Sequence, residues 1–287
     1  MKKRNLYILL LVFSAAIFSC KKEYSVENGG NVNNPLIVGT NCRISQINYY
    51  DSASGVVLGS IAAIITAKDS VTSISKFDSL NNSIQFLGPV TYSADTTHIN
   101  ADEYYLINPS TGYISQLHGL TNPNDVFSPQ FDAAYTYDAT GHLINKSYSL
   151  TSNPGVPYYI VNYTYTGGNL THMQSTDGGI NQLIADADLD YYTNISPQHF
   201  LYLFPDELSY TYYNQFFNFG KKPVNAVKNL KIRYYDPGNV VRDSTVSTFS
   251  TYIMSRDNYV LSVYMNGDDQ FSIPADAGKL TFSYHCK

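Results

Sequence analysis

The sequence predicts a mostly β protein built as an antiparallel meander, on the strength of three observations. Turn residues recur about every 28 residues, the segments between them alternate apolar and polar side chains, and tyrosine is frequent, with Tyr 27 and Trp 0 among 287 residues. Two strands of about ten residues and two turns fill a repeat of this length. We therefore expect about a dozen hairpin-connected strands in one curved sheet. The pattern leaves open whether that sheet stays open, closes on itself or folds into a sandwich.

The clearest copy of the repeat lies between Tyr135 and Tyr163. It predicts three strands joined by a tight turn at Asp138–Gly141 and a looser turn at Asn153–Gly155. At such turns Asp or Asn hydrogen-bonds its own backbone and Gly adopts positive φ, while β-branched and aromatic residues continue as strands. The same turn chemistry recurs at Ser54-Gly55, Asn81-Asn82, Thr111-Gly112, Gly167-Gly168 and Pro237-Gly238.

The start of the chain has the plan of a secretory signal, with a basic start, an apolar run and the small residue Ser19. Ile17-Phe18-Ser19-Cys20 resembles the lipobox of bacterial lipoproteins, in which the cysteine is acylated and becomes the mature first residue. Phe18 departs from the small residue usual at its position. We expect a lipoprotein signal peptide at 1–19, lipidation of Cys20 and a flexible tether at 20–41. The alternative is an ordinary cleaved signal, or a short anchor, with a chance cysteine.

Two cysteines remain, Cys42 at the start of the expected domain and Cys286 next to its end. In an oxidising compartment such a pair favours a disulfide, which requires the first and last strands to meet. The alternative is two free buried thiols. The disulfide is the stronger hypothesis because the pair brackets a single β-rich domain, which we expect at 42–287.

Residues 183–191 alternate hydrophobic residues with Asp186, Asp188 and Asp190, and so predict a strand with three carboxylates on one face. The hydrophobic residues would also fit a helix, but the alternation is longer. Clustered carboxylates are ligands that calcium prefers, which makes these three a candidate cation site. A calcium-binding loop starting at Asp186 fails, because Tyr191 stands where glycine is needed. The favoured interpretation is a solvated strand face, and we expect no metal and no other cofactor.

The repeat is interrupted by an insertion at about 193–229, which we expect to be small and helical or irregular. Hydrophobic residues recur there at helical spacing, at Leu208, Tyr212, Phe216 and Phe219. A protein or glycan partner would stack on exposed aromatic rings, for which the candidates are Tyr212, Tyr213, Phe216 and Phe217. The alternative, which the sequence favours, is that the insertion covers one face of the sheet with a core of its own.

The sequence contains no motif of a catalytic site. The six histidines are scattered, and Gly-x-Ser-x-Gly, a phosphate loop and Cys-x-x-Cys are all missing. A formal charge of -5 without a basic stripe argues against nucleic acid as a partner. We expect a lipid-anchored, non-catalytic envelope protein that binds a protein or glycan. The alternatives are a hydrolase whose active-site residues are distant in sequence, and a purely structural envelope lipoprotein.

Two resemblances add to this interpretation. Tyr137-Asp138-x-x-Gly141-x-Leu143 resembles the tyrosine–aspartate repeat of bacterial shell and wall proteins. The whole layout is similar to a family of uncharacterised Bacteroidota outer-membrane lipoproteins, which the chain matches at Cys42-Arg43-Ile44 and at Gly220-Lys221-Lys222-Pro223-Val224-Asn225. That family implies a curved, mostly antiparallel sheet in the cell envelope and brings no catalytic residues. Lys22-Glu23 resembles the short signal that sends some of these lipoproteins to the cell surface, so either side of the outer membrane stays open.

Overall fold

Strands that follow one another in the sequence are also neighbours in the sheet. The computed structural model describes residues 41–79, 82–93, 95–100, 102–120, 130–204, 214–267 and 277–286. This part of the chain forms one antiparallel meander sheet of seventeen strands. They are β1 (Cys42–Asp51), β2 (Val57–Ile65), β3 (Val71–Asp78), β4 (Ser83–Leu87), β5 (Thr91–Tyr92), β6 (Thr96–His98), β7 (Tyr104–Ile107), β8 (Ile114–Leu120), β9 (Phe131–Tyr137), β10 (Leu143–Leu150), β11 (Pro157–Thr166), β12 (Asn169–Asp177), β13 (Leu183–Tyr191), β14 (Val227–Asp236), β15 (Val240–Met254), β16 (Val260–Asn266) and β17 (Ala277–Cys286).

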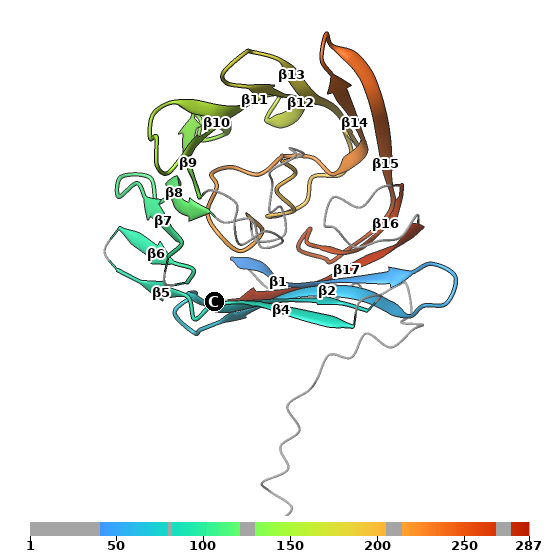
Figure 1. Ribbon diagram of the computed structural model, residues 1–287. Helices are drawn as coiled ribbons and strands as arrows, with labels where there is room; N and C mark the ends of the chain where they lie inside the picture. The colour runs from blue at the N-terminus through green and yellow to red at the C-terminus, as the bar shows by residue number, and fades with distance from the viewer. Residues whose placement is uncertain are drawn as a thin grey trace, which may run out of the picture. The chain divides into compact units, whose positions relative to one another are not determined.

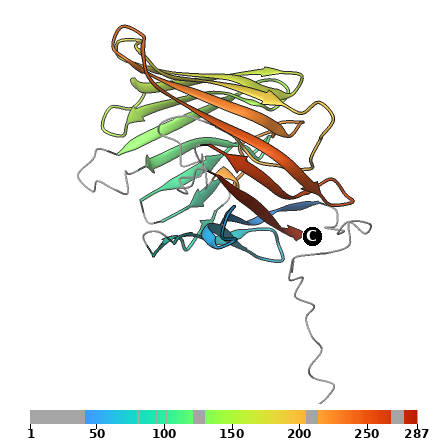
Figure 2. The same cartoon turned by 90° about the vertical axis from the view of Figure 1, so that its right-hand side faces the viewer.

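The sheet curls so far that its last strand pairs with its first (Figure 1). Cys42 lies opposite Cys286 in this pairing, and a disulfide with a Cα–Cα distance of 4.0 Å joins them. The sheet is nevertheless not closed, because no ladder pairing of the described residues joins β4 to β5. At that place Val90 of the connecting segment donates its N–H to the carbonyl of Thr72 in β3 (2.8 Å). In Figure 2 the strands run obliquely across the view, and the β14–β15 hairpin projects beyond its neighbours.

Local sequence determines the hairpins. The segment from Tyr135 to Tyr163 folds as β9, β10 and β11 joined by the two turns that its residues predict. In the first turn the Asp138 carboxylate accepts hydrogen bonds from the backbone N–H groups of Thr140 (2.8 Å) and His142 (2.9 Å), and Gly141 has a φ of 93°. This turn favours a short acidic side chain such as Asp138, which binds the backbone N–H groups. It also favours a residue without Cβ such as Gly141, which adopts positive φ without strain. The prediction of a curved, mostly antiparallel β fold is confirmed.

The insertion between β13 and β14 fills the concave side of the sheet, where Figure 1 shows it enclosed by the strands. Five consecutive residues, Phe200–Phe204, are all buried, and so are Phe216 and Phe219. Phe204 packs on Tyr163 of β11 and Phe219 on Tyr135 of β9, with ring centroids 5.3 Å apart in both pairs. A strand on a surface would expose every second residue, so an unbroken buried run means that the sheet surrounds this segment.

Four tyrosine hydroxyls make the same contact in the described part of the sheet. Each donates to the backbone carbonyl of the residue that begins a strand beside it: Tyr92 to Val71 (3.0 Å), Tyr137 to Ile114 (2.6 Å), Tyr252 to Val227 (2.6 Å) and Tyr284 to Val260 (2.7 Å). All four accepting residues are buried and lie at a register shift in the ladder. A register shift takes the ladder partner away from a backbone group, and a buried carbonyl without a partner is unfavourable. The hydroxyl supplies that partner, while the ring adds to the core.

The structure departs from the sequence prediction in two details of the fold. It contains more strands than the dozen expected, because β4 to β7 are only two to five residues long and are joined by brief turns. The insertion ends earlier than Asn229, since β14 begins at Val227. The helical segment expected from Leu208 to Phe219 lies outside the described residues as far as 213, and that part stays a prediction. Its described part at 215–219 is not helical. Among the residues described, no helix is both long and apolar enough to span a membrane.

Candidate functional site

Polar side chains form two rows across the outer face of the sheet. In β13 the side chains of Ala185, Ala187 and Leu189 are buried in the core. Their neighbours Asp186 and Asp188 therefore point outward, as the alternation of a strand requires. Residues opposite these two in the adjacent strands point outward as well, which extends the pattern across the sheet.

The ladder registers place these outward residues in line with one another. The first row runs from β9 to β15 through Thr136, Asn145, Asn162, Gln174, Asp186, Arg233 and Ser244. The second row runs from β11 to β14 through Thr164, His172, Asp188 and Lys231. We call these eleven residues the polar surface. At the usual strand spacing of about 4.8 Å the first row is roughly 29 Å long.

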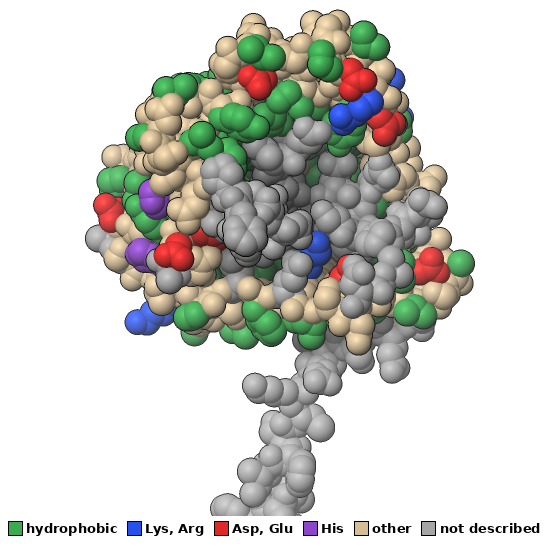
Figure 3. Space-filling model, viewed as in Figure 1, with side chains coloured by type: hydrophobic (Ala, Val, Ile, Leu, Met, Phe, Trp, Pro, Cys, Tyr) green, Lys and Arg blue, Asp and Glu red, His purple; other side chains and the backbone are tan. Residues whose placement is uncertain are grey.

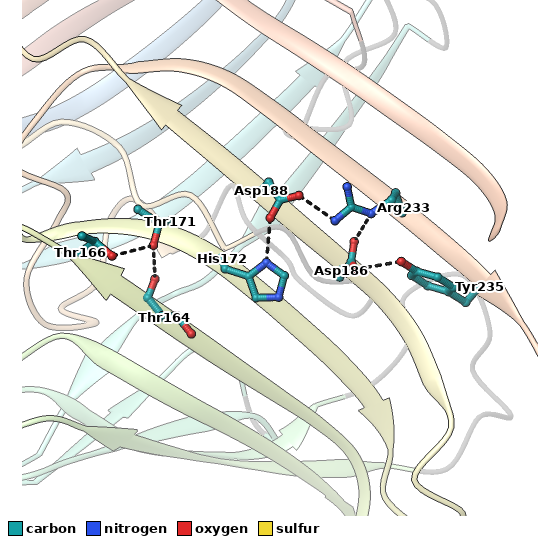
Figure 4. Close-up of polar contacts among 8 residues, drawn as sticks. All are labelled: Thr164, Thr166, Thr171, His172, Asp186, Asp188, Arg233 and Tyr235. Atoms are coloured by element: carbon teal, nitrogen blue, oxygen red, sulfur yellow. Dashed lines mark hydrogen bonds and ion pairs between the residues drawn. The ribbon is translucent and has the colours of Figure 1, made fainter. Parts of the chain in front are cut away.

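Arg233 lies at the centre of the charged part of this surface (Figure 4). Its Nε lies 2.6 Å from Oδ1 of Asp186 and its Nη2 lies 2.7 Å from Oδ2 of Asp188. His172 Nδ1 lies 2.8 Å from the other oxygen of Asp188, and the Tyr235 hydroxyl donates to Oδ2 of Asp186 (2.8 Å). Three strands are thus linked through their side chains as well as through their backbones.

These contacts fix the charge states of the cluster. Partial burial would raise the pKa of Asp188, but hydrogen bonds from His172 and Arg233 outweigh it and lower that pKa below its ordinary value. Hydrogen bonds to the two carboxylates raise the pKa of Arg233. Burial, followed by the hydrogen bond to Asp186, raises the pKa of the Tyr235 hydroxyl. At neutral pH the Arg233 guanidinium is therefore charged and lies against an ionised Asp188.

In the structure the three aspartates of the candidate cation site contact side chains of the neighbouring strand β14. Asp186, Asp188 and Asp190 share one face of β13, as the sequence predicts. Asp186 and Asp188 bind Arg233, and Asp190 accepts a hydrogen bond from the side chain of Asn229 (3.3 Å). Within the described ranges no group of three or more His, Cys, Asp or Glu residues could hold a metal ion. A protein cation thus takes the place that a metal would need.

The aromatic candidates of the insertion do not form an exposed surface where they are described. Phe216 is only 2% exposed. Phe217 is half-buried and packs on Tyr105, with ring centroids 4.9 Å apart. Phe216 thus belongs to the core on the concave side and Phe217 packs against that core, while partner binding by these rings stays a prediction. Tyr212, Tyr213 and the lipidation candidate Cys20 lie outside the described residues.

Sequence reasoning did not connect the residues of the polar surface. It singled out the aspartates from their spacing within one strand, but Arg233 lies 45 residues beyond Asp188 and His172 lies 16 residues before it. Only the pairing of β12, β13 and β14 brings the three together. The one local signal was that β14 also alternates, with Leu230 and Ile232 inward and Lys231 and Arg233 outward.

Comparison with known proteins identifies the fold. No protein-family model matches the sequence, and no curated protein does. A solved structure of a porin-like protein from Bacteroides uniformis ATCC 8492 is similar, with a TM-score of 0.56 at 10% sequence identity over 84% of this chain and 98% of that one. A porin-like protein from Bacteroides vulgatus ATCC 8482 matches with a TM-score of 0.47 at 14% identity, over 85% of this chain and 99% of that one. At such identities the likeness to the first protein shows a shared fold.

Proposed function

We propose that this protein is a lipid-anchored, non-catalytic binding module of the bacterial outer membrane, and that it holds a protein or glycan partner on the polar surface. The observation that supports this most is the unbroken row of amide, hydroxyl and charged side chains across seven strands. Amides offer donors and acceptors together, and carboxylates offer acceptors only. A long row of such groups on the convex outer face suits an extended polar ligand that follows the curve of the sheet.

The charge states favour binding over catalysis at this surface. A glycoside hydrolase needs one carboxyl group with a raised pKa that can give up a proton. Asp188 has the opposite property, since His172 and Arg233 lower its pKa. An anion paired with a guanidinium accepts hydrogen bonds but does not act as a general acid.

The proposed location rests on the beginning of the chain. The signal-like residues 1–19, Cys20 after Ser19 and the polar tether at 20–41 together support acylation of Cys20. The resemblance to Bacteroidota outer-membrane lipoproteins agrees with the same arrangement. Metabolic labelling with a radioactive fatty acid tests it, since the label has to be incorporated by the natural chain and be lost in Cys20→Ala. Label retained by Cys20→Ala would contradict the assignment.

Binding is tested with the mature chain against immobilised envelope glycans and peptides of known structure. Asn162 and Gln174 are exposed and lie side by side in the first row, so Asn162→Ala with Gln174→Ala removes two amides without emptying the core. With about 1 kcal/mol for each hydrogen bond, the double variant should bind at least tenfold more weakly. Asn266→Ala, an exposed amide outside the polar surface, is the matched control and should bind normally. Equal affinity of the double variant and the control, or turnover of any ligand, would refute the proposal.

A further inference from the structure

The outer face of β2, β3 and β4 is hydrophobic. Ile61 of β2 and Ile74 of β3 are buried inward, so the residues alternating with them point outward. Among these outward residues Phe86 is 74% exposed, Ile64 66% and Ile84 60%. Monomeric soluble proteins seldom expose a contiguous surface of this kind unless something covers it.

The ladder registers place Phe77, Ile84 and Phe86 together, while Ile64 lies opposite Ser73 of β3. Phe77 lies opposite Ile84, and Phe86 lies opposite Ser75, so the rings and the isoleucine are direct or diagonal neighbours. The remaining outward positions in the two ladders are Ser60, Ala62 and Ser73. The outward face of 60–64, 73–77 and 84–86 therefore consists of hydrophobic residues and serines, with no charged side chain. We call it the apolar face.

The opposite side of the sheet has the opposite character. The polar surface spans β9 to β15, and its charged residues Asp188, Lys231 and Arg233 lie on β13 and β14, which Figure 1 shows across the concave interior from β2 and β4. In the same view Figure 3 shows several green side chains along the lower margin, where β2 and β4 lie, with a blue one at its left end, and red and blue side chains close together near β14, where green ones are also present. A partner that covers the apolar face thus leaves the polar surface free.

The position of Cys42, where the chain enters the domain, suggests what covers the apolar face. β1 begins at Cys42 and pairs with β2, so the apolar face begins one strand away from the end of the tether. A tether of about 20 residues reaches at most about 70 Å and has a root-mean-square length of about 25 Å. An acyl group on Cys20 therefore keeps the domain within about 70 Å of the lipid surface, and the apolar face adjoins the strand at which the chain enters the domain.

We propose that the apolar face of β2 to β4 lies against the lipid surface in which the Cys20 anchor is inserted. This inference rests on the lipid anchor of the proposed function, and it adds an orientation in which the polar surface points away from the membrane. Because the face has hydrophobic side chains and no basic ones, its affinity for lipid comes from apolar burial and is insensitive to salt.

The absence of tryptophan from the sequence allows a direct test. Phe86→Trp introduces a single tryptophan on the apolar face, and Gln174→Trp introduces one on the polar surface as the matched control. Both are made in the full acylated chain, reconstituted into phosphatidylcholine vesicles whose acyl chains are brominated near the head group. The emission of Phe86→Trp should shift to shorter wavelength and fall by at least half relative to unbrominated vesicles. The emission of Gln174→Trp should stay unchanged.

A second measurement separates this proposal from the anchor itself. The Cys20→Ser chain, which has no acylation site, should still bind the same vesicles weakly at high lipid concentration and equally at low and high salt. Adding Phe86→Ser and Ile84→Ser should lower its partition coefficient about a hundredfold, because each side chain contributes about tenfold.

The outcomes are distinct. Quenching of Phe86→Trp in the acylated chain together with salt-independent binding of the Cys20→Ser chain supports the proposal. If the acylated chain binds vesicles but Phe86→Trp is quenched no more than Gln174→Trp, the apolar face does not lie against lipid. The lipid anchor is then still supported. If the purified natural chain has no acyl group but the Cys20→Ser chain still binds through Phe86 and Ile84, the lipid anchor is refuted. Lipid contact by the apolar face is then still supported. A blue-shifted emission without lipid that grows with protein concentration identifies a second copy as the occupant and overturns the proposal.

Discussion

Removing one hydroxyl from Tyr137, Tyr252 or Tyr284 is expected to destabilise the sheet by about 2 kcal/mol in each case. Substitution by Phe keeps the ring in the core and deletes only the hydrogen bond of 2.6 or 2.7 Å to a backbone carbonyl. The net loss of such a bond is about 1 kcal/mol, and a buried acceptor left without a partner adds about 1 kcal/mol or more. The accepting residues are at most 2% exposed, so water does not replace the hydroxyl easily.

Urea unfolding of the protein measures this effect. The midpoint should fall at constant slope, and the melting temperature should fall by about 4–8 °C for a chain of this size. Tyr264→Phe is the control, because Tyr264 points outward and is 40% exposed, and its stability should stay within about 0.5 kcal/mol of the natural chain. The substitutions at Tyr137 and Tyr284 should be additive, since the two contacts lie in different parts of the sheet. If all three Phe variants resemble the control, the hydroxyls do not stabilise the register shifts.

High pH gives an independent check of the same groups. Burial raises the pKa of Tyr137, Tyr252 and Tyr284 above the ordinary value of about 10. A raised folded pKa means that the folded state keeps its proton where the unfolded state loses it. The stabilisation is therefore complete below pH of about 10 and is lost as the pH rises above it. Each Phe variant should show a shallower alkaline loss of stability than the natural chain.

Three further predictions concern other contacts. Gln215→Leu should destabilise by about 3 kcal/mol in urea unfolding, because the Gln215 amide pairs both the N–H (2.8 Å) and the carbonyl (2.7 Å) of buried Tyr202. Gln215→Glu should not restore stability at neutral pH, because its buried carboxylate cannot donate to the Tyr202 carbonyl. Side-chain and backbone hydrogen bonds outweigh burial and lower the pKa of Asp138 to about 2, so its stabilising effect is present above pH of about 4 and lost as the pH falls through about 2. Asp138→Asn should remove that part of the acid dependence, and an unchanged acid profile would contradict this. Reduction of the Cys42–Cys286 disulfide, which joins residues 244 positions apart, should lower stability by up to about 5 kcal/mol, and a Cys42→Ser, Cys286→Ser chain should show no response to reductant.

The hairpins could be predicted because their determinants are local. Asp138 and Gly141 specify a turn through their own backbone geometry, and the strand at 183–191 follows from alternation within nine residues. Strand alternation also gave the outward direction of the aspartates. These features need no knowledge of what lies beside them.

The remaining features depend on contacts between distant segments. The sequence does not show whether Phe216 is buried inside the protein or exposed for a partner, because the residue type is the same in both cases. The curvature of the sheet, which encloses Phe216, decides between these alternatives. Arg233 became part of the site through the register of β13 and β14, which is set by pairing along the whole strand. The role of the tyrosine hydroxyls depends on register shifts that the sequence does not mark.

The position of the insertion limits where a partner binds. A curved sheet usually offers its concave side to a ligand, but here Phe200–Phe204, Phe216 and Phe219 occupy that side and pack on the strands around them. Recognition by the described strands therefore falls to their outer face. That face differs around the sheet, with hydrophobic residues and serines on β2 to β4 and paired charges on β12 to β14. In the two proposals made above, lipid contact and partner binding use surfaces of opposite polarity and therefore do not compete. A substitution on one surface should consequently leave the other function intact, which is the behaviour expected of a module that holds a ligand away from the membrane.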